Sequence, residues 1–146
     1  MEHRNVADVL RSQGHRLTPQ RLVVLDIIQS SGQHLTAEQI HASVTARHPY
    51  VNLATVYRTL QWLEDVGLVA PIVIAGQPIC YEYVRGDVHH HLVCVECGYQ
   101  MEIDDSIMDS IKSQLLEHYG FAAQLNHLAL PGRCAGCREE PLHTDA

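Results

Sequence analysis

Apolar residues in the first 66 positions recur at the three- and four-residue spacing of amphipathic helices. Residues that start or stop helices bound these segments: Thr18-Pro19 precedes the second one, and Gly32 follows it. Thr36 has Gln39 three residues later, which is a capping-box pattern, and Asn52 precedes the fourth segment. The pattern therefore predicts helices over residues 2–13, 19–31, 37–47 and 53–66.

The spacing changes after Gly67. Two β-branched runs at 68–74 and 79–84 predict a hairpin, with Gly76 and Pro78 in its turn. Helices followed by a hairpin are typical of a winged helix-turn-helix, in which the later helix enters a DNA groove. Beyond it we expect short strands around 92–93 and at 99–103, a helix over 105–119 and a last strand over 121–130. The predicted fold class is α+β.

Four of the five cysteines form two Cys-x-x-Cys pairs, Cys94 with Cys97 and Cys134 with Cys137. Two such pairs complete a closed tetrahedral site of four thiolates, which is the usual structural Zn²⁺ site. The alternative is buried or disulfide-bonded thiols. The N-terminus has no apolar signal-peptide core, so we expect a cytoplasmic protein and favour zinc. Cys80 is interpreted as a buried, inert thiol.

Three consecutive histidines lead into the first cysteine pair. On a strand, His89 and His91 project to one face and His90 to the other, so they would serve different neighbours. Glu82 and Glu102 lie on flanking predicted strands and are candidate oxygen ligands. Imidazole and carboxylate together suit a mixed transition-metal site. The alternative is a solvated histidine run.

The net charge of −7 is unevenly distributed, because the first 66 residues balance six arginines against six acidic residues. The two parts of the chain therefore differ electrostatically, as two domains with different tasks would. No apolar run approaches the ~20 residues of a membrane-spanning helix, so we expect no membrane association. The candidate DNA-contacting residues lie on or near the predicted helices: Arg16, Arg21, Thr55, Tyr57 and Arg58.

Two functions from other classes compete with a DNA-binding regulator. A zinc-dependent hydrolase needs three ligands, an open position and a general base, but the chain has no His-Glu-x-x-His motif. A zinc-ribbon interaction module would leave the N-terminal arginines without a role. We therefore expect a protein that is not an enzyme and has no small-molecule substrate.

The chain resembles the ferric uptake regulator family of bacterial metal-dependent repressors. The likeness runs from about Val6 to Arg138 and is carried by Leu17-Thr18-Pro19-Gln20-Arg21, Ala54-Thr55-Val56-Tyr57-Arg58-Thr59-Leu60, His89-His90-His91-Leu92-Val93-Cys94 and the two cysteine pairs. It implies a homodimer that binds palindromic double-stranded operator DNA when metal is bound. It also implies a winged-helix DNA-binding domain over 1–84, a hinge at 85–89 and a dimerisation and metal-binding domain over 90–146.

The same resemblance implies two further metal sites. The regulatory site would use His34, Glu82, His89, His91 and Glu102. An additional site would use His90, Asp109 and His127, with Val88 standing where the family has a further histidine. Histidine and carboxylate ligands suit Fe²⁺, which we favour, and also Zn²⁺ or Mn²⁺. Zinc-, manganese- or peroxide-sensing members of the same family remain the alternatives.

Overall fold

The computed structural model of the chain describes residues 6–32, 34–84 and 86–138. The chain divides into two compact units. Unit 1 comprises Met1–Pro71 and Ile79–Arg85, and unit 2 comprises Ile72–Pro78 and Gly86–Ala146. Among the described residues, no helix combines the length and the apolar character that crossing a membrane requires.

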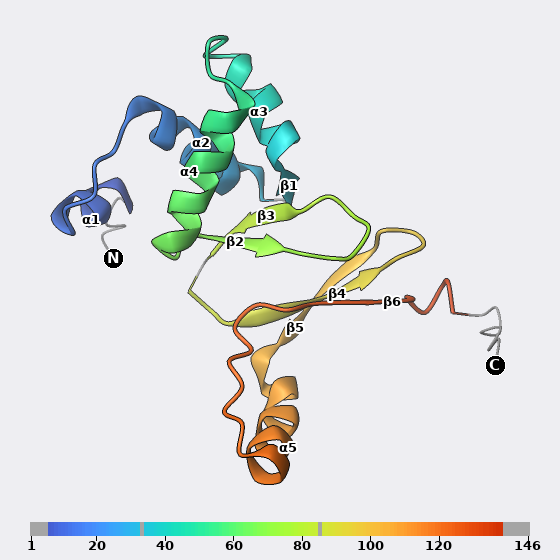
Figure 1. Cartoon of the computed structure of the whole chain (residues 1–146). Helices are drawn as coiled ribbons and strands as arrows, with labels where there is room; N and C mark the ends of the chain where they lie inside the picture. Colours follow the sequence, from blue (N-terminus) through green and yellow to red (C-terminus); the bar gives the residue numbers. More distant parts are fainter. Residues whose placement is uncertain (1–5, 33, 85, 139–146) are drawn as a thin grey trace. The chain divides into compact units, whose positions relative to one another are not determined.

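Unit 1 is mainly helical, with α1 at Val6–Ser12, α2 at Pro19–Ser31, α3 at Ala37–Thr45 and α4 at Leu53–Asp65 (Figure 1). The predicted starts of the second, third and fourth helices are confirmed. The Thr18 hydroxyl accepts from the Arg21 N–H at 3.3 Å, and the Thr36–Gln39 capping box is present. Gly32 ends α2 with φ of 59°, a left-handed conformation that glycine adopts without steric cost. The first predicted helix included residues 2–5, which lie outside the described residues.

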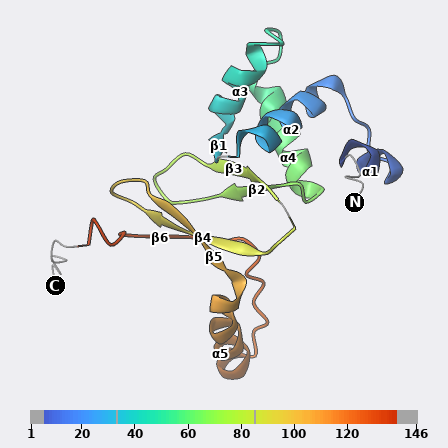
Figure 2. The same cartoon turned by 180° about the vertical axis from the view of Figure 1, so that it is seen from behind.

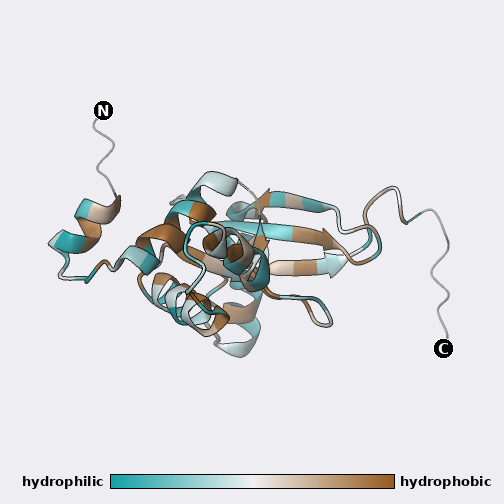
Figure 3. Ribbon diagram, turned by 90° about the horizontal axis from the view of Figure 1, so that it is seen from above, coloured by the Kyte–Doolittle hydropathy of each residue, from teal (hydrophilic) through white to brown (hydrophobic). Residues whose placement is uncertain are grey.

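The core of unit 1 forms where α2, α3 and α4 pack together. Its nearly inaccessible side chains are Val24, Ile28, Ile40, Val44, Val56, Leu60 and Leu63. Burying each one contributes about 1.5–3 kcal/mol relative to leaving it in water. Hydrophobic and hydrophilic residues are interspersed along the helices (Figure 3), and in α2, α3 and α4 the buried ones are apolar residues at helical spacing, apart from Thr59.

A three-stranded sheet completes the winged helix-turn-helix, in the order β1-β3-β2. Its strands are β1 at Leu35–Thr36, β2 at Val69–Ile72 and β3 at Cys80–Tyr83. The two hairpin strands are confirmed but shorter than predicted. The sequence did not indicate β1, which is only two residues long and pairs antiparallel with β3, Leu35 opposite Tyr81.

Unit 2 contains a second three-stranded sheet in the order β5-β4-β6 (Figures 1 and 2). The strands are β4 at His89–Cys94, β5 at Gln100–Asp104 and β6 at Ala129–Gly132. β4 is central, pairing antiparallel with β5 and parallel with β6. Between β5 and β6 the chain forms a 3₁₀ turn, Asp105–Met108, and α5 at Asp109–Tyr119.

The predicted strand over 121–130 is wrong for most of its length. Residues 121–128 form no strand, and β6 begins only at Ala129. Because β6 is parallel to β4, the chain needs a crossover connection between these two strands, and β5 and α5 lie within it. The chain leaves β5, forms α5 and must then return to the start of β6, so residues 121–128 serve as connection.

Candidate metal centres

The four paired cysteines come together in unit 2. One sulfur from each of Cys94, Cys97, Cys134 and Cys137 lies within 4.8 Å of the others. The sulfurs of Cys97 and Cys134 are 3.7 Å apart. Four thiolates around zinc, each about 2.3 Å from the ion, stand about 3.8 Å apart in a tetrahedron. Both the donor set and the spacing therefore fit a closed Zn²⁺ site.

Backbone hydrogen bonds shape the two turns that carry these cysteines. The Gly98 N–H donates to the Cys94 carbonyl at 3.0 Å, and the Cys137 N–H donates to the Cys134 carbonyl at 3.0 Å. A 2.6 Å ion pair between Arg133 and Glu96 joins one turn to the other. These contacts hold the two cysteine pairs facing each other.

The pKa values of two of the clustered cysteines shift in opposite directions. Hydrogen bonds from the backbone of Cys134, and then of Cys97, lower the pKa of Cys94 to about 6. Hydrogen bonds with the thiols of Cys134, Cys94 and Cys97 raise the pKa of Cys137 to about 12. Four anionic sulfurs this close need a compensating cation, and a divalent metal supplies one.

In unit 1, His34 and Glu82 form a largely buried pair. The Nε2 atom of His34 donates to Oε2 of Glu82 at 2.8 Å. The sheet register explains the contact, because Leu35 lies opposite Tyr81 and the next position out on each strand brings His34 to Glu82. Two of the predicted regulatory ligands are therefore adjacent within this unit.

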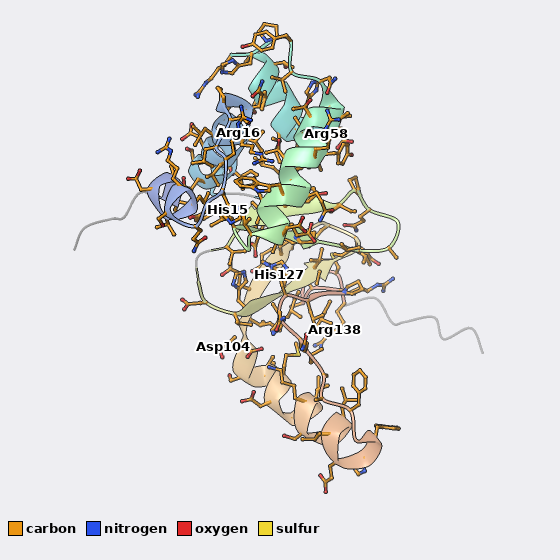
Figure 4. All side chains as sticks on the ribbon, turned by 60° about the vertical axis from the view of Figure 1, so that its left-hand side comes forward. His15, Arg16, Arg58, Asp104, His127 and Arg138 are labelled. Atoms are coloured by element: carbon orange, nitrogen blue, oxygen red, sulfur yellow. The ribbon has the colours of Figure 1, made fainter. Side chains whose placement is uncertain are left out.

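In unit 2, three histidines gather on one face of the sheet. His89 and His91 lie on β4, and His127 comes from the segment before β6. Their ring centroids are 4.9 to 5.5 Å apart, and the Nε2 atoms of His91 and His127 are 3.1 Å apart. Each of the three rings offers a nitrogen within 4.8 Å of the other two. We call this set the histidine cluster; Figure 4 labels His127 beside the strands of unit 2.

His90 occupies the opposite face of β4 and has different partners. It is fully buried, and its Nε2 atom lies 2.8 Å from Oδ1 of Asp105. The ammonium of Lys112 contacts both carboxylate oxygens of Asp105 at 3.2 Å. His90 and then Lys112 lower the pKa of Asp105, because both hydrogen bonds stabilise its charged form.

The structure groups the remaining predicted ligands differently from the grouping that the resemblance implied. Glu102 lies opposite His91 in the β4–β5 register, but it is exposed and does not join the histidine cluster. Asp109 opens α5 and is not gathered with His90 and His127. His127, which the resemblance assigned to the additional site, lies instead with His89 and His91. Only a tertiary fold reveals that grouping, since 36 residues separate His91 from His127.

Of the predicted DNA-contacting residues of unit 1, Arg16, Tyr57 and Arg58 are exposed, whereas Arg21 and Thr55 are half-buried. Figure 4 labels Arg16 and Arg58. On α4, Arg58 donates to the Thr55 hydroxyl at 3.3 Å, and the Tyr57 hydroxyl donates to Glu38 at 3.0 Å. The Tyr57 hydrogen bond raises the pKa of Tyr57, while backbone hydrogen bonding and then Tyr57 lower that of Glu38.

Arg21 is held in place by two contacts. It stacks over the Trp62 ring with 4.2 Å between its guanidinium carbon and the ring centroid. It also donates to the Arg16 carbonyl at 2.7 Å. Arginine and hydroxyl groups held by their own neighbours are preorganised for a ligand.

A winged helix-turn-helix joined in one chain to a unit with cysteine and histidine clusters defines the class: a metal-responsive DNA-binding regulator. A sequence model described as "Ferric uptake regulator family" matches residues 12–130. The "Ferric uptake regulation protein" of Bacillus subtilis is 32% identical and aligns over 94% of this chain and 96% of that protein.

Solved structures of ferric and zinc uptake regulators have a similar fold. A ferric uptake regulator from Francisella tularensis with iron has a TM-score of 0.70 at 25% identity, covering 86% of this chain and 96% of that one. A "Zinc Uptake Regulator Complexed With Zinc AND DNA" has a TM-score of 0.68 at 25% identity, covering 92% and 91%. The chain belongs to the ferric uptake regulator family, whose members are metal-responsive transcriptional repressors.

Proposed function

We propose that this protein is a cytoplasmic homodimeric repressor that binds palindromic operator DNA when a regulatory Fe²⁺ is bound. A Zn²⁺ in the four-cysteine site serves only to hold unit 2 together, because that site has no open coordination position. The observation that carries the proposal is the division of the ligand set. His34 and Glu82 belong to unit 1, whereas His89, His91 and Glu102 belong to unit 2.

A ligand set divided in this way gives a direct switch. One divalent ion bound by both units supplies a cross-link that restricts their relative motion. His34 and Glu82 already contact each other, so unit 1 presents an organised half of the site. A restricted dimer would present both α4 helices at the spacing of a palindrome, about one DNA turn apart. Without the cross-link, DNA binding would carry the cost of ordering the units.

Iron is favoured for the regulatory site by its donors. Imidazole nitrogens and carboxylate oxygens without a thiolate suit Fe²⁺. Zinc and manganese accept the same donors, and the solved relatives include one with iron and one with zinc. The physiological metal would therefore be set by its availability as well as by affinity.

The homodimer is supported by apolar side chains that unit 2 leaves exposed. Leu92, Met101 and Leu130 lie opposite one another across β4, β5 and β6, and they are 38%, 46% and 38% exposed. Among the described residues of α5 none is buried, although Ile111 and Leu116 are apolar and 47% and 57% exposed. A second copy of the same unit would remove this surface from water.

DNA contact is proposed for α4 and its surroundings. Thr55, Tyr57 and Arg58 would face the major groove, and Arg16 with Arg21 would contact phosphates. Unit 2 carries the net negative charge, so only unit 1 is suited to approach DNA.

Duplex selection tests the proposal and identifies the operator at the same time. Metal-loaded protein would be used to enrich binders from a random double-stranded library, and the enriched duplex would then be titrated with and without a chelator that removes Fe²⁺ but leaves the cysteine-bound zinc. We expect an inverted repeat, salt-sensitive binding, and affinity roughly 5- to 150-fold higher with metal.

Arg58→Ala should weaken binding, whereas Arg138→Ala, an exposed arginine of unit 2, should not. Equal affinity before and after chelation would refute the metal switch. Enrichment of sequences without two-fold symmetry would refute the dimeric operator.

A further inference from the structure

The three consecutive histidines of β4 point to two faces of the sheet. The middle one, His90, anchors the segment that carries His127. The Leu128 N–H donates to Nδ1 of His90 at 3.1 Å, and the Leu128 carbonyl accepts from the His91 N–H at 2.7 Å. Both backbone groups of Leu128 are thus bound to β4 one residue before β6 begins. The preceding residue, His127, is consequently held against the side chain of His91.

These contacts determine which ring nitrogen of His90 carries a hydrogen atom. A backbone N–H can only donate, so Nδ1 of His90 must be the acceptor and its proton must be on Nε2. Nε2 then donates to Asp105 at 2.8 Å. Both ring nitrogens of His90 are used within the protein, and neither has a lone pair left for a metal.

The surroundings of His90 also oppose a metal ion. The partner acid, Asp105, already holds the Lys112 ammonium at 3.2 Å. A divalent ion beside Asp105 would meet that positive charge, and a like-charge contact between half-buried groups is unfavourable. Val88, at the position of the family's further histidine, offers no donor atom.

We propose that His127 is a third imidazole ligand of the regulatory ion, together with His89 and His91, and that His90 is a positioning residue. This inference rests on the proposed regulatory site and replaces the additional site expected from the resemblance. The contacts that carry it are the 3.1 Å approach of the His91 and His127 Nε2 atoms and the anchoring of Leu128 by His90. The protein then binds two ions per chain, one at the cysteines and one at the histidine cluster.

A third imidazole changes which metals the site prefers. Imidazole suits iron and zinc, whereas carboxylate and water suit manganese. His127 therefore raises affinity for Zn²⁺ and Fe²⁺ more than affinity for Mn²⁺. The site becomes more selective against manganese than one built from two histidines and carboxylates.

Equilibrium dialysis of the full-length protein, with the cysteine site already filled, tests this inference with Zn²⁺ and Mn²⁺ as probes. The variants are His127→Ala, Asp109→Ala and His118→Ala, the last removing an exposed histidine of α5 as a matched control. We expect His127→Ala to lower Zn²⁺ affinity at the histidine cluster by at least about 10- to 100-fold. Mn²⁺ affinity should fall less, and the visible spectrum of bound Co²⁺ should change.

Asp109→Ala and His118→Ala should leave the stoichiometry at two ions and the Co²⁺ spectrum unchanged. A third ion in the wild type that both Asp109→Ala and His127→Ala remove would overturn the inference, as would an unaltered Co²⁺ spectrum in folded His127→Ala. Circular dichroism measures whether each variant is folded. If His127→Ala does not fold, His127→Asn takes its place in the comparison. No DNA is present, so failure here is distinct from failure of the repressor function.

Discussion

At the scale of single residues, the cysteines show how identical side chains acquire different roles from their surroundings. Cys94 and Cys134 belong to a cluster of four sulfurs within 4.8 Å. Cys80 lies on β3 of unit 1 and is not part of that cluster, and burial raises the pKa of its thiol. Cys80 therefore stays protonated at neutral pH, whereas the clustered sulfurs are close enough together to hold a metal ion.

Replacing one clustered cysteine should unfold unit 2. We expect Cys134→Ser to lose its Zn²⁺ and the ordered structure of the β5-β4-β6 sheet, because metal binding at such sites is part of the folding free energy. Cys80→Ser, the same chemical change on β3, should retain both. A chromophoric chelator measures the zinc content of each variant, and circular dichroism measures whether it is folded. A zinc-free Cys134→Ser protein with an intact sheet would contradict the structural role.

The roles of the cysteines can be predicted from the sequence, whereas the roles of His127 and His90 cannot, and the difference has a physical reason. Two Cys-x-x-Cys pairs indicate a four-sulfur site because each pair is local and its chemistry is restrictive. The partnership of His127 with His91 could not be predicted, since it depends on where Leu128 meets β4. The role of His90 likewise follows from a backbone donor 38 residues away.

At the scale of elements, the starts of α2, α3 and α4 are the best-predicted features because their signals are local. Asn52 caps α4 by accepting from the Thr55 N–H at 2.9 Å and the Thr55 hydroxyl at 2.8 Å. The extent of β6 was mispredicted because a strand edge depends on a distant partner. Ala129 to Gly132 are a strand only because β4 lies beside them in parallel.

Removing the α4 cap should destabilise unit 1 modestly. Asn52→Ala leaves N–H groups of the first turn without their acceptor, and we expect a loss of about 1 kcal/mol in the free energy of unfolding. Asn52→Ser keeps an acceptor at the same place and should lose much less. Urea denaturation at fixed protein and metal concentration gives both values. Equal destabilisation by alanine and serine would show that the hydrogen bond is not the cause.

At the scale of the whole molecule, the two units differ in which kinds of residue they expose. Unit 1 completes its own core from α2, α3 and α4 and uses its surface for arginines and hydroxyls. Unit 2 instead leaves apolar residues exposed on its sheet and on α5. The proposed repressor would need such a surface, because presenting two recognition helices to a palindrome requires pairing with an identical copy.

Charging that surface should therefore separate the proposed dimer. Ile111 on α5 is apolar and 47% exposed within one chain, so Ile111→Glu should leave the fold of unit 2 intact. In a dimer the new carboxylate would lose its water, at a cost of several kcal/mol per buried charge, and we expect dissociation at least tenfold easier. Ser113→Glu adds the same charge on the same helix, two residues away and thus on another face, and should not change assembly.

Analytical ultracentrifugation over a dilution series measures the dissociation constant of each variant. In the proposed repressor, operator affinity comes from two linked binding units. The same Ile111→Glu protein should therefore lose most of its preference for an inverted repeat over a half-site. Metal binding at the cysteines should be unaffected, since Ile111 is not part of that cluster. An Ile111→Glu protein that dimerises as tightly as wild type would exclude this face of α5 from the interface and leave the row of apolar residues across β4, β5 and β6 as the surface to test next.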